Sequence, residues 1–233
     1  MALEPDGGLL TWTPEGDELG QHGVSLAADD GHGVAGRDVA EQFEQIEVRI
    51  VDLATGEYIE DLDPNDYDAQ AALRNPAQSD ALDKSVDIAN IKRRERYAKV
   101  YLLRDGDEIE TIILPIRGYG LWSTMYGFIA LEADGNTVSG LSFYEHGETP
   151  GLGDKIEDPR WLGLWPGKKV YGADGEPQLE VIRGRAAADD PHSIDGMAGA
   201  TLTGRGVTNM LAFWLGGQGY GPYLRGLEQT GSD

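Results

Sequence analysis

The stretch Tyr97-Ala-Lys-Val-Tyr-Leu-Leu-Arg-Asp-Gly-Asp-Glu-Ile-Glu-Thr-Ile-Ile-Leu-Pro-Ile116 determines the fold. Its two strand-like runs flank Asp105-Gly106-Asp107, a compact turn, and this pattern predicts a β-hairpin. A second pair of runs, residues 125–132 and 137–144, flanks Ala133-Asp-Gly-Asn136 and predicts a second hairpin. Strands that are adjacent in sequence pair antiparallel. We therefore expect a twisted antiparallel sheet of hairpins.

Helices are expected to surround this sheet. Asp158 followed by Pro159 predicts a short helix that reaches Trp165. Thr203 is expected to cap a closing helix, which runs to Leu215 and is stopped by Gly216-Gly217. The other expected elements are strands at 46–53 and 179–183 and helices at 38–45 and 88–96. Hairpins with helices collected around them indicate the α+β class.

Composition limits the possible functions. The 233 residues are 40% hydrophobic, which is enough for one globular domain. The chain has no cysteine, so it forms no disulfide and ligates no iron–sulfur cluster. Its four histidines are scattered and form no pair at metal-ligand spacing, so no metal site is expected. The net charge of −22 repels nucleic acid and anionic membranes, so neither is an expected partner.

The chain is expected to divide into two parts. Residues 1–36 are rich in Gly and Asp without a sustained period, which predicts an irregular or disordered N-terminal segment. Residues 37–233 are expected to form the functional domain. No stretch approaches the roughly 20 consecutive apolar residues that span a bilayer.

The segment Asp195-Gly-Met-Ala-Gly-Ala-Thr-Leu-Thr203 places a reactive hydroxyl among very small neighbours. Gly199 and Ala200 leave the backbone almost bare, so a phosphate or a modifying enzyme can approach Thr201 closely. The N-terminus of the helix that follows offers unpaired N–H groups, which suit a phosphate. A simple turn into a helix, with Thr201 or Thr203 as its cap, is the alternative interpretation.

This segment is similar to the flavin-attachment motif of the FMN-binding subunits of ion-pumping electron-transfer complexes, in which a Ser/Thr-Gly-Ala-Thr threonine carries the FMN phosphate. Two further segments, Gly118-Tyr-Gly-Leu-Trp-Ser-Thr-Met-Tyr-Gly127 and Glu145-His-Gly-Glu-Thr-Pro-Gly-Leu-Gly153, occur in the family's order and spacing. With the ending from Phe213 to Tyr223, they resemble the C subunits of the sodium-pumping NADH:quinone reductase. The resemblance runs from about Val34 to the end.

The resemblance implies that 37–233 is an FMN-binding domain and that FMN is joined by a phosphoester to Thr201. A separate flavin transferase, which uses FAD and magnesium, would attach it. Ala198 stands where the family has Ser or Thr, which is expected to weaken recognition. Further cofactor contacts are expected at Gly199, Ala200, Thr203, Glu148, Thr149, Gly151, Leu152, Gly153, Trp122 and Ser123. No catalytic residue is expected.

The resemblance also implies a place in a larger assembly. The chain would relay electrons from an iron–sulfur centre to the flavin of the membrane subunit, at the outer (periplasmic) face of the bacterial inner membrane. Its partners would be the other subunits of the reductase. The family's N-terminal membrane helix has no counterpart in residues 1–33, so the chain as given is expected to be soluble and to reach the membrane through partners or a missing anchor.

Two alternatives stay open. The G subunit of the ferredoxin:NAD reductase complex shares Glu-Thr-Pro-Gly-Leu-Gly, although Gly120-Leu-Trp-Ser-Thr-Met-Tyr126 favours the sodium pump. A cofactor-free interaction or scaffold domain of the same fold is the other alternative. Ala198 and the missing anchor support it.

Overall fold

The computed structural model describes residues 9–16, 22–29 and 46–230, and the chain divides into two compact units, Met1–Ile46 and Glu47–Asp233. In the first unit, β1 (Leu9–Gly16) pairs antiparallel with β2 (His22–Asp29). This pair differs from the irregular chain expected for residues 1–36, because both strands contain β-forming residues such as Trp12 and Val24. The helix expected at 38–45 lies outside the described residues.

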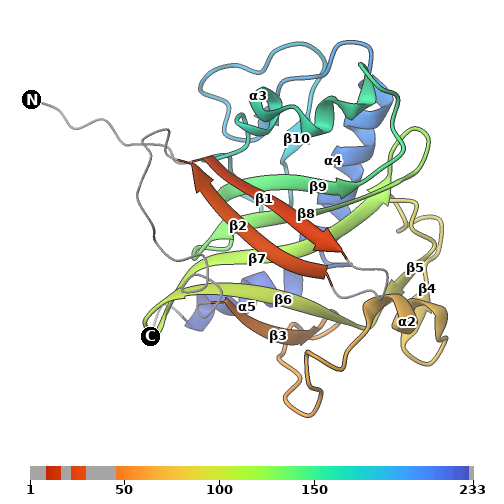
Figure 1. Cartoon of the computed structure of the whole chain (residues 1–233), viewed down its shortest axis with the longest axis vertical. Coiled ribbons are helices and arrows are strands. Elements are labelled where there is room, and N and C mark those ends of the chain that lie inside the picture. Colours follow the sequence, from red (N-terminus) through yellow and green to blue (C-terminus); the bar gives the residue numbers. More distant parts are fainter. Residues whose placement is uncertain (1–8, 17–21, 30–45, 231–233) are drawn as a thin grey trace, which may run out of the picture. The chain divides into compact units, whose positions relative to one another are not determined.

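The second unit is built on a five-stranded sheet in the order β3-β6-β7-β8-β9 (Figure 1). The strands are β3 (Ile46–Asp52), β6 (Tyr97–Asp105), β7 (Glu108–Tyr119), β8 (Thr124–Glu132) and β9 (Val138–Glu145). β6, β7, β8 and β9 pair antiparallel in succession, so both predicted hairpins are confirmed. Gly106 and Gly135 have φ values of 62° and 64°, which lets the hairpin turns close.

Helices and short strands complete this unit. The helices are α2 (Ala69–Arg74), α3 (Pro159–Leu162), α4 (Thr201–Leu215), α5 (Gly221–Thr230) and the 3₁₀ helix η1 (Gly153–Glu157). The short strands are β4 (Ser79–Ala81), β5 (Arg93–Glu95), β10 (Glu180–Val181) and β11 (Ser193–Ile194). The α+β class is confirmed, and α3 begins where predicted because the Asp158 side chain accepts the Arg160 N–H at 2.9 Å.

Two expected local structures are wrong. The closing helix begins at Thr201, Ala200 is its N-cap residue, and Thr203 caps nothing because its side chain is buried inside the first turn. No helix forms at 88–96, where β5 lies instead. Asn90 and Lys92 have φ values of 55° and 68°, which a right-handed helix does not permit.

The core lies between the sheet and α4, which packs on β7 and is drawn behind the sheet in Figure 1. Two glycines bring this helix close to the sheet. A Cβ on Gly118 would stand 2.6 Å from Cβ of Met210, and a Cβ on Gly206 would stand 2.7 Å from the carbonyl oxygen of Tyr119. The first half of α4 therefore rests directly on the turn between β7 and β8, which fixes the position of Thr201.

Gly206→Ala should destabilise the protein by about 1–3 kcal/mol, because the new methyl group would push α4 away from the backbone of the β7–β8 turn. Gly204→Ala is the matched control in the same helix. Its Cβ would stand 3.1 Å from a methyl group of Val181, which can move, and the gain in helix propensity offsets the contact. Denaturant unfolding measures both variants, and equal stabilities would contradict the packing described here.

Candidate functional site

A buried carboxylate joins the three sequence segments singled out above. Glu148 is 5% exposed, and its Oε1 accepts the backbone N–H groups of Leu121 and Trp122, each at 3.0 Å. Its Oε2 accepts the Thr203 hydroxyl at 2.5 Å. One side chain thus holds the β7–β8 turn, the loop that follows β9 and the first turn of α4 in a fixed arrangement.

Because both match one cofactor site of the family, the Glu145–Gly153 loop and the Asp195–Thr203 segment are predicted to face each other across one cleft. These two segments, called the glycine-rich segments below, do meet in space. Lys155 Nζ donates to the Ala198 carbonyl at 3.3 Å, and a Cβ on Gly199 would stand 2.7 Å from Leu152 Cδ2. A Cβ on Gly153 would stand 2.8 Å from the Thr203 oxygen. Gly153, at which a cofactor contact is expected, leaves room for the contact between Glu148 and Thr203.

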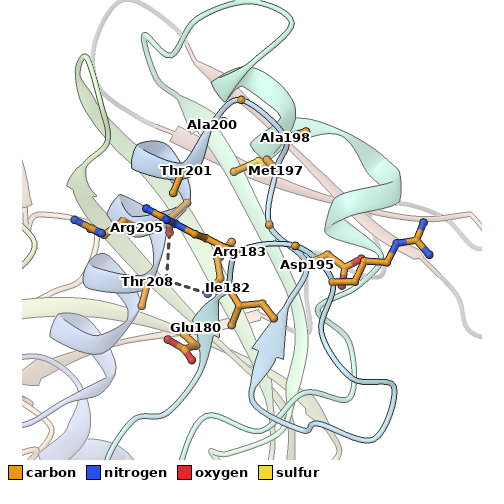
Figure 2. A pocket seen from close by; sticks show the side chains of 16 residues that line it. Glu180, Ile182, Arg183, Asp195, Met197, Ala198, Ala200, Thr201, Arg205 and Thr208 are labelled. Atoms are coloured by element: carbon orange, nitrogen blue, oxygen red, sulfur yellow. Dashed lines mark hydrogen bonds between the residues drawn. The ribbon is translucent and has the colours of Figure 1, made fainter.

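A pocket of about 640 Å³ lies beside Thr201, and we call it the Thr201 pocket (Figure 2). One wall is the segment from Asp195 to Thr201 with Arg205 of α4, and the other wall is the segment from Glu180 to Arg185. The Thr208 hydroxyl joins the two walls, because it accepts the Val181 N–H at 2.9 Å and donates to the Gly204 carbonyl at 3.2 Å. The two glycine-rich segments are in direct contact, so the pocket lies between the 195–201 segment and the 180–185 segment and not, as predicted, between the two glycine-rich segments.

The two threonines at the start of α4 differ in availability. Thr201 is exposed and opens onto the pocket, and α4 has no side-chain cap over its first N–H groups. Thr203 is fully buried, and Glu148 binds its hydroxyl. Of the two, only the Thr201 oxygen is therefore free to react with a ligand in this pocket.

Comparison with known proteins identifies the family. Residues 120–216 match the family model of the FMN-binding domain. The chain is 48% identical over 84% of its length to the C subunit of the Na(+)-translocating NADH-quinone reductase of Pseudomonas aeruginosa, and 47% identical over 83% of its length to that of Yersinia pestis; these matches cover 77% and 74% of the relatives. The chain belongs to the family of C subunits of this reductase. The resemblance inferred from the motifs is confirmed.

Solved structures agree with this assignment. NqrC of Shewanella oneidensis superimposes with a TM-score of 0.77 at 36% identity, covering 84% of this chain and 90% of that one. The C subunit of the same reductase from Parabacteroides distasonis gives a TM-score of 0.59 at 26% identity, with coverages of 83% and 86%. The chain is therefore a flavoprotein subunit of an oxidoreductase complex, and it has the fold of the FMN-binding domain.

The residues around Thr201 fit an FMN phosphate. A phosphodiester keeps one negative charge, and the first-turn N–H groups of α4 with the Arg183 and Arg205 guanidinium groups of the pocket supply positive charge. Arg183 stands on the wall opposite Arg205 (Figure 2). The sequence analysis missed both arginines, because no local pattern links positions 183 and 205.

The other predicted contacts divide into two groups. The Trp122 and Leu152 side chains are 63% and 42% exposed, so both are available to a flat ligand. The remaining residues shape the loops: Ser123 Oγ accepts the Gly147 N–H at 2.6 Å, the Thr149 carbonyl accepts the Leu152 N–H at 3.1 Å, and Gly151 has a φ of 76°. His146 Nδ1 likewise accepts the Glu148 N–H at 3.1 Å.

The described residues contain no candidate metal site and no candidate membrane-spanning helix. In the part of the chain that the structure describes, no group of His, Asp and Glu side chains could hold a metal ion. Within the same ranges, no helix combines the length and the hydropathy needed to cross a bilayer.

Thr203→Val should lower the free energy of unfolding by about 1–3 kcal/mol, because it keeps the shape of the side chain and leaves Glu148 Oε2 without its donor in a buried position. Thr203→Ser keeps the hydroxyl and is the control. Thermal or denaturant unfolding measures the difference. Equal losses in both variants would show that packing, and not the hydrogen bond, is what Thr203 contributes.

Proposed function

We propose that this chain is an electron carrier that holds FMN by a phosphoester to Thr201. The observation that carries the proposal is the contrast between the two threonines. The Thr201 hydroxyl is exposed beside a pocket that three arginines and two carboxylates line, and the Thr203 hydroxyl is bound to Glu148. The family match to an FMN-binding domain supports the cofactor.

Attachment requires an enzyme. Threonine is a weak nucleophile at neutral pH, and the residues that line the pocket beside Thr201 include no histidine that could serve as its base. A flavin transferase would use FAD as donor: a bond forms between the Thr201 oxygen and the FMN phosphorus, the pyrophosphate bond breaks, and AMP leaves. The Thr201 proton passes to a base of the transferase. The small residues from Gly196 to Ala200 leave this approach open.

The residues of the chain would then position the cofactor. The first turn of α4, with Arg183 and Arg205, would hold the phosphodiester, and Leu152 and Trp122 would lie beside the ring. The attached flavin supplies reversible one-electron chemistry, while the protein supplies its position and its electrostatic environment. We propose that electrons arrive from an iron–sulfur centre and leave to the flavin of the membrane subunit, at the outer face of the inner membrane.

We propose that the flavin-carrying domain lies within residues 37–233 and comprises the second compact unit, Glu47–Asp233. Its partners would be the other subunits of the reductase. The curated relatives are named C subunits, which favours this role over the ferredoxin-linked G subunit. The scaffold alternative predicts a chain that never acquires flavin.

Electron relay can be tested with the flavin-labelled chain and the Pseudomonas aeruginosa reductase purified without its own C subunit. Under anaerobic conditions, NADH should bleach the visible absorbance of the attached flavin only when that reductase is present, because the relay proposal gives this chain no NADH site of its own. The same mixture with unlabelled chain is the control, because it measures the absorbance change of the flavins that belong to the reductase. Bleaching by NADH alone, or none with the reductase, would contradict the relay.

A further inference from the structure

A second pocket, of about 440 Å³, lies where α2 and β5 adjoin the ends of β7 and β8. Four cationic side chains line it: Arg74, Lys92, Arg93 and Arg117. No Asp or Glu is among its lining residues, although the chain carries 41 acidic residues against 19 basic ones. We call it the basic pocket, and it is a local reversal of the charge of the whole molecule.

Two of the four cations are engaged within the fold. Arg117 forms a bidentate ion pair with Glu95 at 2.6 and 2.8 Å; burial lowers the pKa of its guanidinium, but Glu95 outweighs this and raises that pKa above its ordinary value. Arg93 donates to the carbonyl and hydroxyl oxygens of Ser79. The guanidinium groups of Arg93 and Arg117 are therefore largely occupied by contacts within the fold, and few of their N–H groups remain for a ligand.

The other two cations have no ion-pair partner, although Lys92 Nζ donates a hydrogen bond to the Asn90 amide oxygen. Arg74 and Lys92 are exposed, and neither forms an ion pair with any described residue. The Asp87 carboxylate accepts the backbone N–H groups of Ile91 and Lys92 at 2.8 and 2.9 Å and forms no ion pair with the Lys92 ammonium. The pocket therefore presents two positive charges without an ion-pair partner to an incoming anion.

The backbone at the pocket is strained. Asn90 and Lys92, which both line it, are the non-glycine residues with positive φ in the described ranges, at 55° and 68°. Asp87 holds this strained turn through the two hydrogen bonds given above. Backbone strain of this kind collects at binding and switch regions, since the surrounding structure must maintain it.

Exposed apolar side chains continue from the pocket toward the candidate flavin site. Tyr119 lines the pocket and is 39% exposed, and its hydroxyl donates to the Trp122 carbonyl at 3.0 Å. Its backbone N–H donates to the Ala89 carbonyl at 2.8 Å, next to Ile88, which is 47% exposed. Exposed Trp and Tyr beside an available Arg is the composition of protein–protein interfaces and their hot spots.

We propose that the basic pocket, with Tyr119 and Trp122 beside it, is the docking surface for an acidic segment of a partner polypeptide. A carboxylate of that segment would bind Arg74 and Lys92, and its neighbouring apolar side chains would cover the two aromatic rings. A small free anion would leave those rings in water, and an extended anionic membrane would meet the acidic surface around the pocket as well as the pocket itself. The inference rests on the proposed function, which requires a partner that exchanges electrons beside Trp122.

The test is a charge reversal. The full, flavin-labelled chain is titrated into the Pseudomonas aeruginosa reductase that lacks its own C subunit, at low and at moderate salt. Arg74→Glu/Lys92→Glu should weaken binding at least about tenfold and flatten its salt dependence. Arg160→Glu/Arg225→Glu makes the same change in net charge on other exposed helical positions and should change the affinity less than about threefold. Arg74→Lys/Lys92→Arg should bind like the wild type.

Several outcomes would overturn the docking surface. The proposal fails if both charge-reversed variants lose binding equally, or if the wild type does not bind the reductase. It also fails if inorganic phosphate displaces the reductase more than another salt does at equal ionic strength. It fails as well if phosphatidylglycerol vesicles capture the wild type but not Arg74→Glu/Lys92→Glu. Flavin in a denaturing gel reports separately on the proposed function. If labelling at Thr201 fails while the variant still loses binding, the docking surface stands and the flavin proposal falls.

Discussion

Thr201→Ala should abolish covalent flavin attachment and leave the fold intact. When the wild-type chain is co-expressed with a flavin transferase, we expect its mass to rise by one FMN less one water, and its band to fluoresce in a denaturing gel. Thr201 is exposed and its side chain does not cap α4, so its loss should change stability by no more than about 0.5 kcal/mol. Thr201→Ala should therefore carry no covalent flavin while its stability stays close to that of the wild type.

Matched variants separate the attachment site from its surroundings. Thr203→Ser keeps the bond to Glu148 and should be labelled like the wild type. Ala198→Ser introduces the hydroxyl that the resemblance implies at this position, and it should be labelled at least as fast. Flavin on the Thr201→Ala chain would place the attachment elsewhere. An unlabelled wild type beside a labelled relative would favour the scaffold alternative.

Glu95→Ala should cost about 3–5 kcal/mol of stability, because it leaves the Arg117 charge buried without a partner. The side chains of Arg117 and Glu95 are 12% and 6% exposed, and the guanidinium carbon lies 5.0 Å from the centre of the Trp214 ring. The Trp214 indole in turn donates to the Arg117 carbonyl at 2.7 Å. This pair therefore anchors the end of α4 to β7.

Two controls test the cause of that loss. Asp80→Ala breaks the pair with Arg96, whose side chains are 47% and 50% exposed, and should cost no more than about 1 kcal/mol. The double variant Glu95→Leu/Arg117→Met removes both charges and should recover most of the stability lost by Glu95→Ala. Denaturant unfolding measures all of them. If the double variant is as unstable as the single one, packing and not unpaired charge is responsible.

The sheet could be predicted from the sequence because its signals are local. Each hairpin has its turn residues between two strand-like runs, and Gly106 and Gly135 occupy the positions that need positive φ. The region 88–96 was predicted as a helix because nothing within it forbids one. Its actual structure depends on Asp87 binding the turn and on Tyr119 binding Ala89, and the latter contact is distant in sequence.

The site was predictable in part for the same reason. Thr201 follows from a local motif, and the contact between the two glycine-rich segments follows from the resemblance. The role of Thr203 does not, because a threonine at a helix start resembles a cap until its partner is known, and Glu148 is 55 residues away. Arg183 and Arg205 belong to no local pattern, and the fold alone brings them to one pocket.

Peptide mapping tests the flavin attachment most directly. Trypsin should release Ala186 to Arg205 as one peptide, which contains three hydroxyl side chains, Ser193, Thr201 and Thr203. Fragmentation of this peptide from the labelled chain should place the mass of FMN less water on Thr201. Flavin mass on Ser193 or Thr203, or on a different peptide, would contradict the assignment of Thr201 as the flavin carrier.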